Sequence, residues 1–146
     1  MFSALNANDR MAAVAAVIVL VTGIISLANQ WGFLMVLPIL AGVGVLGVIF
    51  QARMAPATKL PMTKGTLLLA LGAGAAVIWV IVTVQWIEYI LTPPIFIFDS
   101  IQFVIGLVAA LVMAFAGWRA YQAEKGTAGV SPPTEAPPAP PAPPAA

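Results

Sequence analysis

Four polar residues beside the long apolar segments have the types and spacing to do chemistry: Gln85, Glu88, Asp99 and Gln102. Glu88 is the only acidic residue attached to an apolar segment, and Gln85 lies three residues before it, on the same face of a helix. Two carboxylates held close together can bind a cation or share a proton. Ordinary interfacial acids and a helix cap are the expected interpretation. A small anionic cluster of these four residues, able to bind a cation, is the alternative.

The elements that must position these residues are apolar segments long enough to cross a bilayer. Of the 146 residues, 62% are hydrophobic and 8% are charged, whereas soluble domains have about a quarter charged residues. A bilayer core of about 30 Å needs about 20 apolar residues in a helix. Segments that meet this need are 11–28, 33–50, 66–86 and 101–118. The sequence therefore predicts an all-α integral membrane protein, a bundle of four transmembrane helices.

The breaks between these segments predict how the helices connect. Asn29 and Gln30 allow only a short turn, so the first two helices should form an antiparallel hairpin, and the last two form a second one. Thr63 is the expected N-cap of the third helix, because its hydroxyl can accept from a first-turn N–H. Asp99 and Gln102 have the spacing of a capping box that opens the fourth helix.

The distribution of basic residues predicts the orientation of the chain. The six are Arg10, Arg53, Lys59, Lys64, Arg119 and Lys125. With four spans and a cytoplasmic N-terminus, all of them face the cytoplasm, as the positive-inside rule favours. We expect a multi-pass protein of the plasma (inner) membrane with both termini cytoplasmic. A signal peptide cleaved after Ala28 is the alternative, although the first apolar run is as long as a spanning helix.

Aromatic residues mark where the expected helices leave the bilayer, because tryptophan and tyrosine favour membrane–water interfaces. The expected interface anchors are Trp31, Trp86, Tyr89, Trp118 and Tyr121. The third helix reaches Trp86 after 21 residues, or about 31 Å at 1.5 Å per residue. Glu88 therefore falls at the exterior edge of the bilayer and not inside it.

Small residues recur along the fourth segment at helical spacing: Gly106, Ala110, Ala114 and Gly117. Such a helix-packing stripe allows close approach of another membrane helix. Ala70 and Gly74 of the third segment fit the same rule. Two interpretations stay open, which are packing within the bundle and packing against a second copy or a larger membrane complex.

The composition changes after residue 125, which divides a membrane domain (1–125) from a Pro/Ala-rich tail (126–146). The tail holds eight of the chain's 13 prolines. We expect it to be disordered, with polyproline II character, and to lie in the cytoplasm. A spacer and a ligand for a proline-binding domain are both compatible with it. Gly126 is the expected C-cap of the fourth helix.

Composition also argues against several function classes. The chain has no cysteine and no histidine, which are the commonest sources of thiolate ligands, imidazole ligands and general bases. A net charge of +1 is far from the basic surface of a nucleic-acid-binding protein. We therefore expect no enzyme activity, no cofactor, no metal and no nucleic-acid partner; the expected partners are the lipid bilayer and other membrane helices.

The leading hypothesis is a small non-enzymatic membrane protein that acts as an accessory or scaffold subunit through helix packing. One alternative is an oligomeric transporter or channel with an exterior site at Glu88 and Asp99. The small multidrug resistance family has a similar size and span number, but its first span carries a membrane-embedded glutamate that this chain lacks. Another alternative is a holin-like protein that permeabilises membranes.

Overall fold

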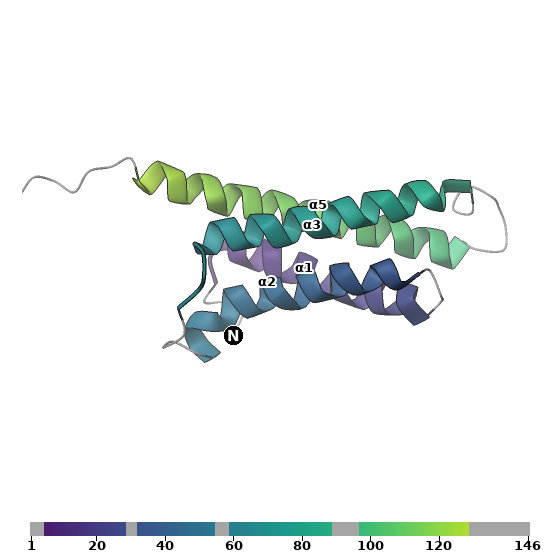
Figure 1. Cartoon of the computed structure of the whole chain (residues 1–146), viewed down its shortest axis with the longest axis horizontal. Helices are drawn as coiled ribbons and strands as arrows, with labels where there is room; N and C mark the ends of the chain where they lie inside the picture. Colours follow the sequence, from purple (N-terminus) through teal and green to yellow (C-terminus); the bar gives the residue numbers. More distant parts are fainter. Residues whose placement is uncertain (1–4, 29–31, 55–58, 89–96, 129–146) are drawn as a thin grey trace, which may run out of the picture.

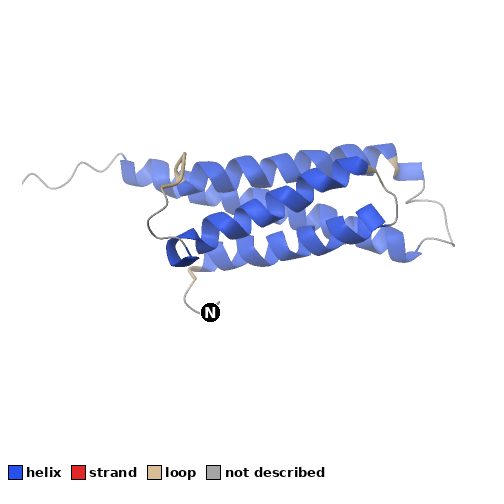
Figure 2. Cartoon of the chain, turned by 60° about the horizontal axis from the view of Figure 1, so that its bottom comes forward, coloured by secondary structure: helices blue, strands red, loops and turns tan. Residues whose placement is uncertain are grey.

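The computed structural model describes residues 5–28, 32–54, 59–88 and 97–128, and the elements assigned in these ranges are all helical (Figure 1, Figure 2). In chain order they are α1 (Ala7–Ala28), the 3-10 helix η2 (Phe33–Met35), α2 (Val36–Met54), α3 (Lys64–Gln85) and α5 (Ile97–Ala128). Within these ranges four helices are long and apolar enough to cross a membrane, as predicted. Apart from its first three residues, the predicted disordered tail lies outside the described ranges.

The four long helices form a ring in which each packs against two others. Both α1 and α3 pack against α2 on one side and α5 on the other. Consecutive helices run antiparallel, which gives the hairpins α1–α2 and α3–α5 (Figure 1). The interior is filled by apolar side chains, the largest of which are Trp79, Phe103, Met35, Leu68 and Met113. Polar residues therefore stand out wherever they enter this interior.

Large apolar side chains cover the outside of the ring as well. Val14, Leu40, Val80 and Val108, one from each helix, expose between 44% and 59% of their surface. Exposing such an apolar surface to water costs free energy, whereas contact with the acyl chains of a bilayer does not. The outer surface therefore matches the apolar interior of a membrane.

The ends of the helices differ from the predictions in two places. Thr63 is confirmed as the N-cap of α3, since its side chain accepts from the backbone N–H of Thr66. The capping box at Asp99 and Gln102 is wrong, because α5 already begins at Ile97 and the Gln102 side chain bonds to α1. Gly126 is not a C-cap either, because α5 continues through it to Ala128.

The two ends of the bundle have different chemistry. At one end of the bundle, α1 and α3 begin and α2 and α5 finish; we call this the basic end. The opposite end is called the far end. The described basic side chains all lie at or near the basic end: Arg10, Lys59, Lys64, Arg119 and Lys125. With 32 residues, α5 is about 48 Å long and extends past the start of α3 there (Figure 1).

Candidate functional site

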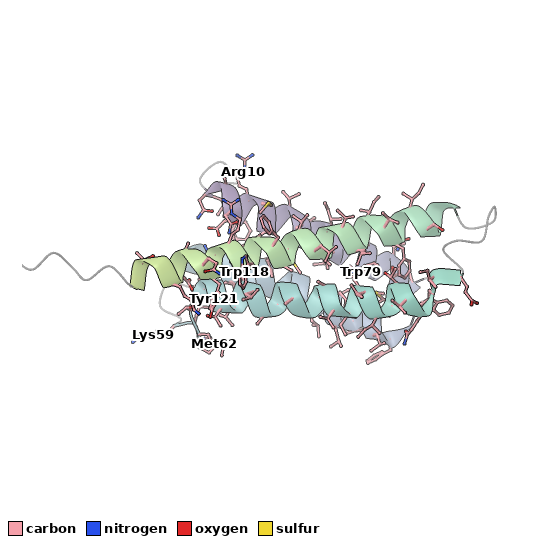
Figure 3. The ribbon with its side chains drawn as sticks, turned by 90° about the horizontal axis from the view of Figure 1, so that it is seen from above. Arg10, Lys59, Met62, Trp79, Trp118 and Tyr121 are labelled. Atoms are coloured by element: carbon pink, nitrogen blue, oxygen red, sulfur yellow. The ribbon has the colours of Figure 1, made fainter. Side chains whose placement is uncertain are left out.

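Polar side chains from three helices meet at the basic end. They are Asn8 and Asp9 of α1, Lys64 of α3, and Arg119 and Glu124 of α5, and we call them the basic-end cluster. Together with Asn6 they border a pocket of about 360 Å³. Figure 3 shows the neighbouring residues Arg10, Lys59 and Tyr121 at the same end of the bundle.

Asp9 is an acidic residue buried within the bundle, only 7% exposed. Its backbone N–H donates to the Asn6 side chain (2.7 Å), which caps the start of α1. Its carboxylate accepts from Nζ of Lys64 at 2.6 Å. A buried carboxylate is costly unless it is paired, and Lys64 supplies the pair from the first residue of α3. The expectation that Glu88 alone adjoins an apolar segment was wrong, because α1 begins at Ala7 and includes Asp9.

Glu124 caps α3 from a different helix. One carboxylate oxygen accepts from the backbone N–H of Gly65 (2.7 Å), and the other accepts from the Thr63 hydroxyl (2.7 Å). A negative charge at a helix N-terminus is favoured by the free N–H groups and the helix dipole. The contact requires glycine, because a Cβ at position 65 would lie 2.6 Å from the Glu124 carboxylate and 2.7 Å from the Tyr121 backbone nitrogen.

Asn8 ties α1 to the backbone of α5. Its Nδ2 donates to the carbonyl oxygen of Ala116 (2.9 Å), while its Oδ1 is buried without a hydrogen-bond partner among the described residues. Arg119 lies over the Phe115 ring, 5.9 Å from its centroid. No three His, Cys, Asp or Glu residues in the described ranges are placed to hold a metal. The basic-end cluster can therefore fasten α1, α3 and α5 together through paired charges and caps.

A second polar contact is buried nearer the far end. Gln102 of α5 donates from Nε2 to the Thr22 carbonyl oxygen (3.1 Å) and to Oγ of Ser26 (2.8 Å), both on α1. The amide orientation follows from chemistry, because a carbonyl oxygen can only accept. Oε1 of Gln102 is buried and has no partner in the part of the chain that the structure describes. Gln102, considered as one member of an exterior polar cluster, instead joins α5 to α1 in the interior of the bundle.

The other members of the predicted exterior cluster are placed differently. Gln85 and Glu88 are exposed at the far end, at and just beyond the end of α3. The Asp99 side chain lies outside what the structure describes, so cation binding by these residues stays a prediction. Of the expected interface anchors, Trp118 is exposed and Trp86 and Tyr121 are partly buried. The remaining two, Trp31 and Tyr89, lie outside the described residues.

The helix-packing stripe of α5 faces α3. Gly106 lies under the ring of Trp79, Ala110 is fully buried, the Ala114 backbone meets Gly72, and Gly117 meets the carbonyl of Leu68. Within the described chain, these small residues serve the close approach of two neighbouring helices. The spacing of the stripe was visible in the sequence, but the helix that it packs against was not.

Trp79 is the buried residue that sequence reasoning missed. It lies six residues before the end of α3, between the helices (Figure 3), and meets Phe103 edge to face with ring centroids 5.2 Å apart. Its Nε1 has no hydrogen-bond partner among the described residues. Tryptophan usually lies at membrane interfaces, so a tryptophan about two turns inside the predicted segment 66–86 was the available signal.

A groove on the outer surface runs between α2 and α3. It has a volume of about 610 Å³ and is bordered by Leu37 and Leu40 of α2 and by Ala70, Gly74 and Val77 of α3. A Cβ added at Gly74 would meet no atom within 4 Å, so this side of α3 is open. The small residues at 70 and 74 therefore face outward, in contrast to the stripe of α5.

Compared with known proteins, the chain matches no family model, no curated protein and no solved structure.

Proposed function

We propose that this protein is a small non-enzymatic subunit of a larger membrane assembly, in which the groove between α2 and α3 receives a transmembrane helix of a partner. The observation that carries the proposal is the outward position of Ala70 and Gly74 on an otherwise bulky apolar surface. Small residues four apart let two membrane helices approach closely, and the resulting van der Waals contact drives association in lipid.

The opposite side of α3 supports this reading. Its inward small residues, Gly72, Ala75 and Ala76, are already buried inside the bundle. Those at 70 and 74 contribute little to that interior, since both are exposed. Exposed side chains elsewhere on the bundle are mostly Val, Leu, Ile or Phe. A recess with small residues at its base allows a partner helix to pack more closely than a surface of bulky side chains does.

We also propose that the protein resides in the plasma (inner) membrane with both termini in the cytoplasm. The gathering of Arg10, Lys59, Lys64, Arg119 and Lys125 at one end supports this orientation, since cytoplasmic loops carry the excess of basic residues. A cysteine introduced at the exposed residue Lys59 should react with a membrane-impermeant maleimide only after the cells are opened.

The test of the subunit proposal combines co-purification and crosslinking. Full-length protein is extracted from its native membrane in mild detergent, and co-migrating chains are identified by mass spectrometry. We expect a stoichiometric membrane partner that is lost in Gly74→Ile. Gly47→Ile is the matched control, because Gly47 is equally open but lies outside the groove.

A photocrosslinking residue at Val77, which borders the groove, should capture the same partner, whereas one at the exposed Val17 of α1 should not. If the chain migrates alone or as a homo-oligomer, the subunit proposal is wrong. The transporter and holin hypotheses would then be tested by the effect of Glu88→Gln on transport and by host killing on expression.

A further inference from the structure

A second groove on the outer surface runs between α1 and α5 and ends at an arginine. Its volume is about 530 Å³, and its walls are apolar, formed by Met11, Val14 and Ile18 of α1 and by Val104, Val108 and Val112 of α5. The one charged residue that borders it, within the described chain, is Arg10. The groove is distinct from that between α2 and α3, since the two share no residue.

The groove has the position and length of an acyl chain in one leaflet. The helices are antiparallel, with Asn8 bonded to Ala116 at the basic end and Thr22 bonded to Gln102 towards the far end. The groove therefore starts at Arg10 near the basic end and runs towards the middle of the bundle. From Arg10 to Ile18 the groove follows α1 for eight residue steps, or about 12 Å, close to the roughly 15 Å of hydrocarbon in one leaflet.

Arg10 is available for an external anion. Its side chain is exposed and makes no ion pair or hydrogen bond with another side chain in the described ranges. Neighbouring cations are engaged differently, since Lys64 is paired with Asp9 and Arg119 lies over Phe115. The Asp9 carboxylate is buried and neutralised by its own lysine, so it repels an anion at Arg10 only weakly.

We infer that this groove binds one anionic phospholipid of the leaflet at the basic end, with an acyl chain along the groove and the phosphate on the Arg10 guanidinium. Arginine presents several N–H donors in a planar fork that matches phosphate oxygens. A basic residue beside a crevice between transmembrane helices, at headgroup level, is the arrangement that favours anionic lipids. The two small lining residues, Ala15 and Ala109, are buried at the base of the groove. The exposed lining is bulky (Val14, Val104 and Val108), so it offers no exposed small-residue surface against which a helix of about 10–12 Å diameter could pack closely.

The test uses the full chain reconstituted in nanodiscs that contain equal amounts of phosphatidylglycerol and phosphatidylcholine. Native mass spectrometry then counts the lipids that remain bound after release from the disc. We expect one retained phosphatidylglycerol on the unaltered protein. Arg10→Gln should lower its retention about fivefold, the effect of one basic residue near an anionic surface. Lys59→Gln, an exposed basic residue away from the groove, should leave retention unchanged.

A second pair of variants tests the groove itself without altering charge. Val108→Phe places an aromatic ring in the groove and should reduce retention, whereas Leu111→Phe changes an exposed residue of the same helix outside it and should not. Circular dichroism and size-exclusion profiles confirm that each variant is folded. Equal retention of the two lipids, or retention that survives both Arg10→Gln and Val108→Phe, would overturn the inference. Loss in Arg10→Gln but not in Val108→Phe would also overturn it, because the acyl chain would then not lie in the groove.

Discussion

One added methyl group at Gly106 should destabilise the packing of α3 against α5. The Cβ of Gly106→Ala would lie 2.5 Å from Cζ2 of Trp79 and still closer to Cη2, compared with 3.4–4 Å for ordinary van der Waals contact. Trp79 cannot swing away, because it is fully buried and its ring meets Phe103 edge to face. The strain must therefore be relieved by separating the two helices.

The expected loss of stability is about 1–3 kcal/mol, the usual effect of overpacking a filled interior. Alanine has a better helix propensity than glycine, by about 0.5–1 kcal/mol. The detergent-unfolded state keeps its helices, so the gain in helix propensity applies to both states and largely cancels. The loss of packing should therefore dominate. Gly74→Ala is the matched control, since nothing lies within 4 Å of its new Cβ, and it should change stability by no more than about 0.5 kcal/mol.

Stability can be measured by titrating the protein from mild detergent into sodium dodecyl sulfate. The chain has no cysteine, so two can be introduced at the exposed residues Leu27 and Gln85 and labelled for energy transfer between α1 and α3. Replacing the large ring should rescue the strained variant. The pair Gly106→Ala and Trp79→Phe should show a favourable coupling of about 0.5–3 kcal/mol.

Equal stability of Gly106→Ala and Gly74→Ala would contradict a tight contact between Gly106 and the Trp79 ring. The same contact would be contradicted if Trp79→Phe and Gly106→Ala destabilised the protein additively, because the ring would then not be the group that the methyl meets.

Three further variants test the polar contacts, each measured by the same titration. Glu124→Ala should cost about 1–3 kcal/mol and speed hydrogen exchange at the Gly65 amide, because the α3 N-terminus loses a charged acceptor. Lys64→Met should also cost about 1–3 kcal/mol, less than in a fully buried pair since Lys64 is 38% exposed, and Asp9→Asn in the same chain should restore most of it. Gln102→Leu should change stability by less than about 1 kcal/mol. The loss of two hydrogen bonds is offset by removal of the buried Oε1, an acceptor that has no partner in the described chain.

Those features that depend on a short stretch of sequence were predictable. The apolar lengths placed four helices, and the Thr63 hydroxyl placed the start of α3 within two residues, because both signals act within one or two turns. The ends of α5 were less predictable. Asp99 resembles a cap and Gly126 a terminator, yet the helix passes through both. Packing of α5 against α3 and α1 outweighs such weak local preferences.

The polar contacts could not be predicted because their partners are distant in the sequence. Nothing near Asp9 shows that Lys64 will neutralise it, and nothing near Gly65 shows that Glu124 will cap it. Gln102 looked like half of a local motif because Asp99 precedes it by three residues. The order of the helices around the ring decides which partner a buried polar group meets. No short stretch of the sequence indicates that order.

The long reach of the α1 contacts has a consequence for how the protein is made. During synthesis, the lysine that pairs with Asp9 is added 55 residues after it, and the carbonyl that pairs with Asn8 is added 108 residues after it. At a translation rate of about 5–20 residues per second, the second delay is roughly 5–20 s. The newly inserted α1–α2 hairpin therefore carries an unpaired carboxylate until Lys64 is synthesised and an unpaired amide until Ala116 is synthesised. We therefore expect this half-made hairpin to be the stage at which membrane insertases and quality-control proteases act on the chain, and arrival of α5 to end that exposure.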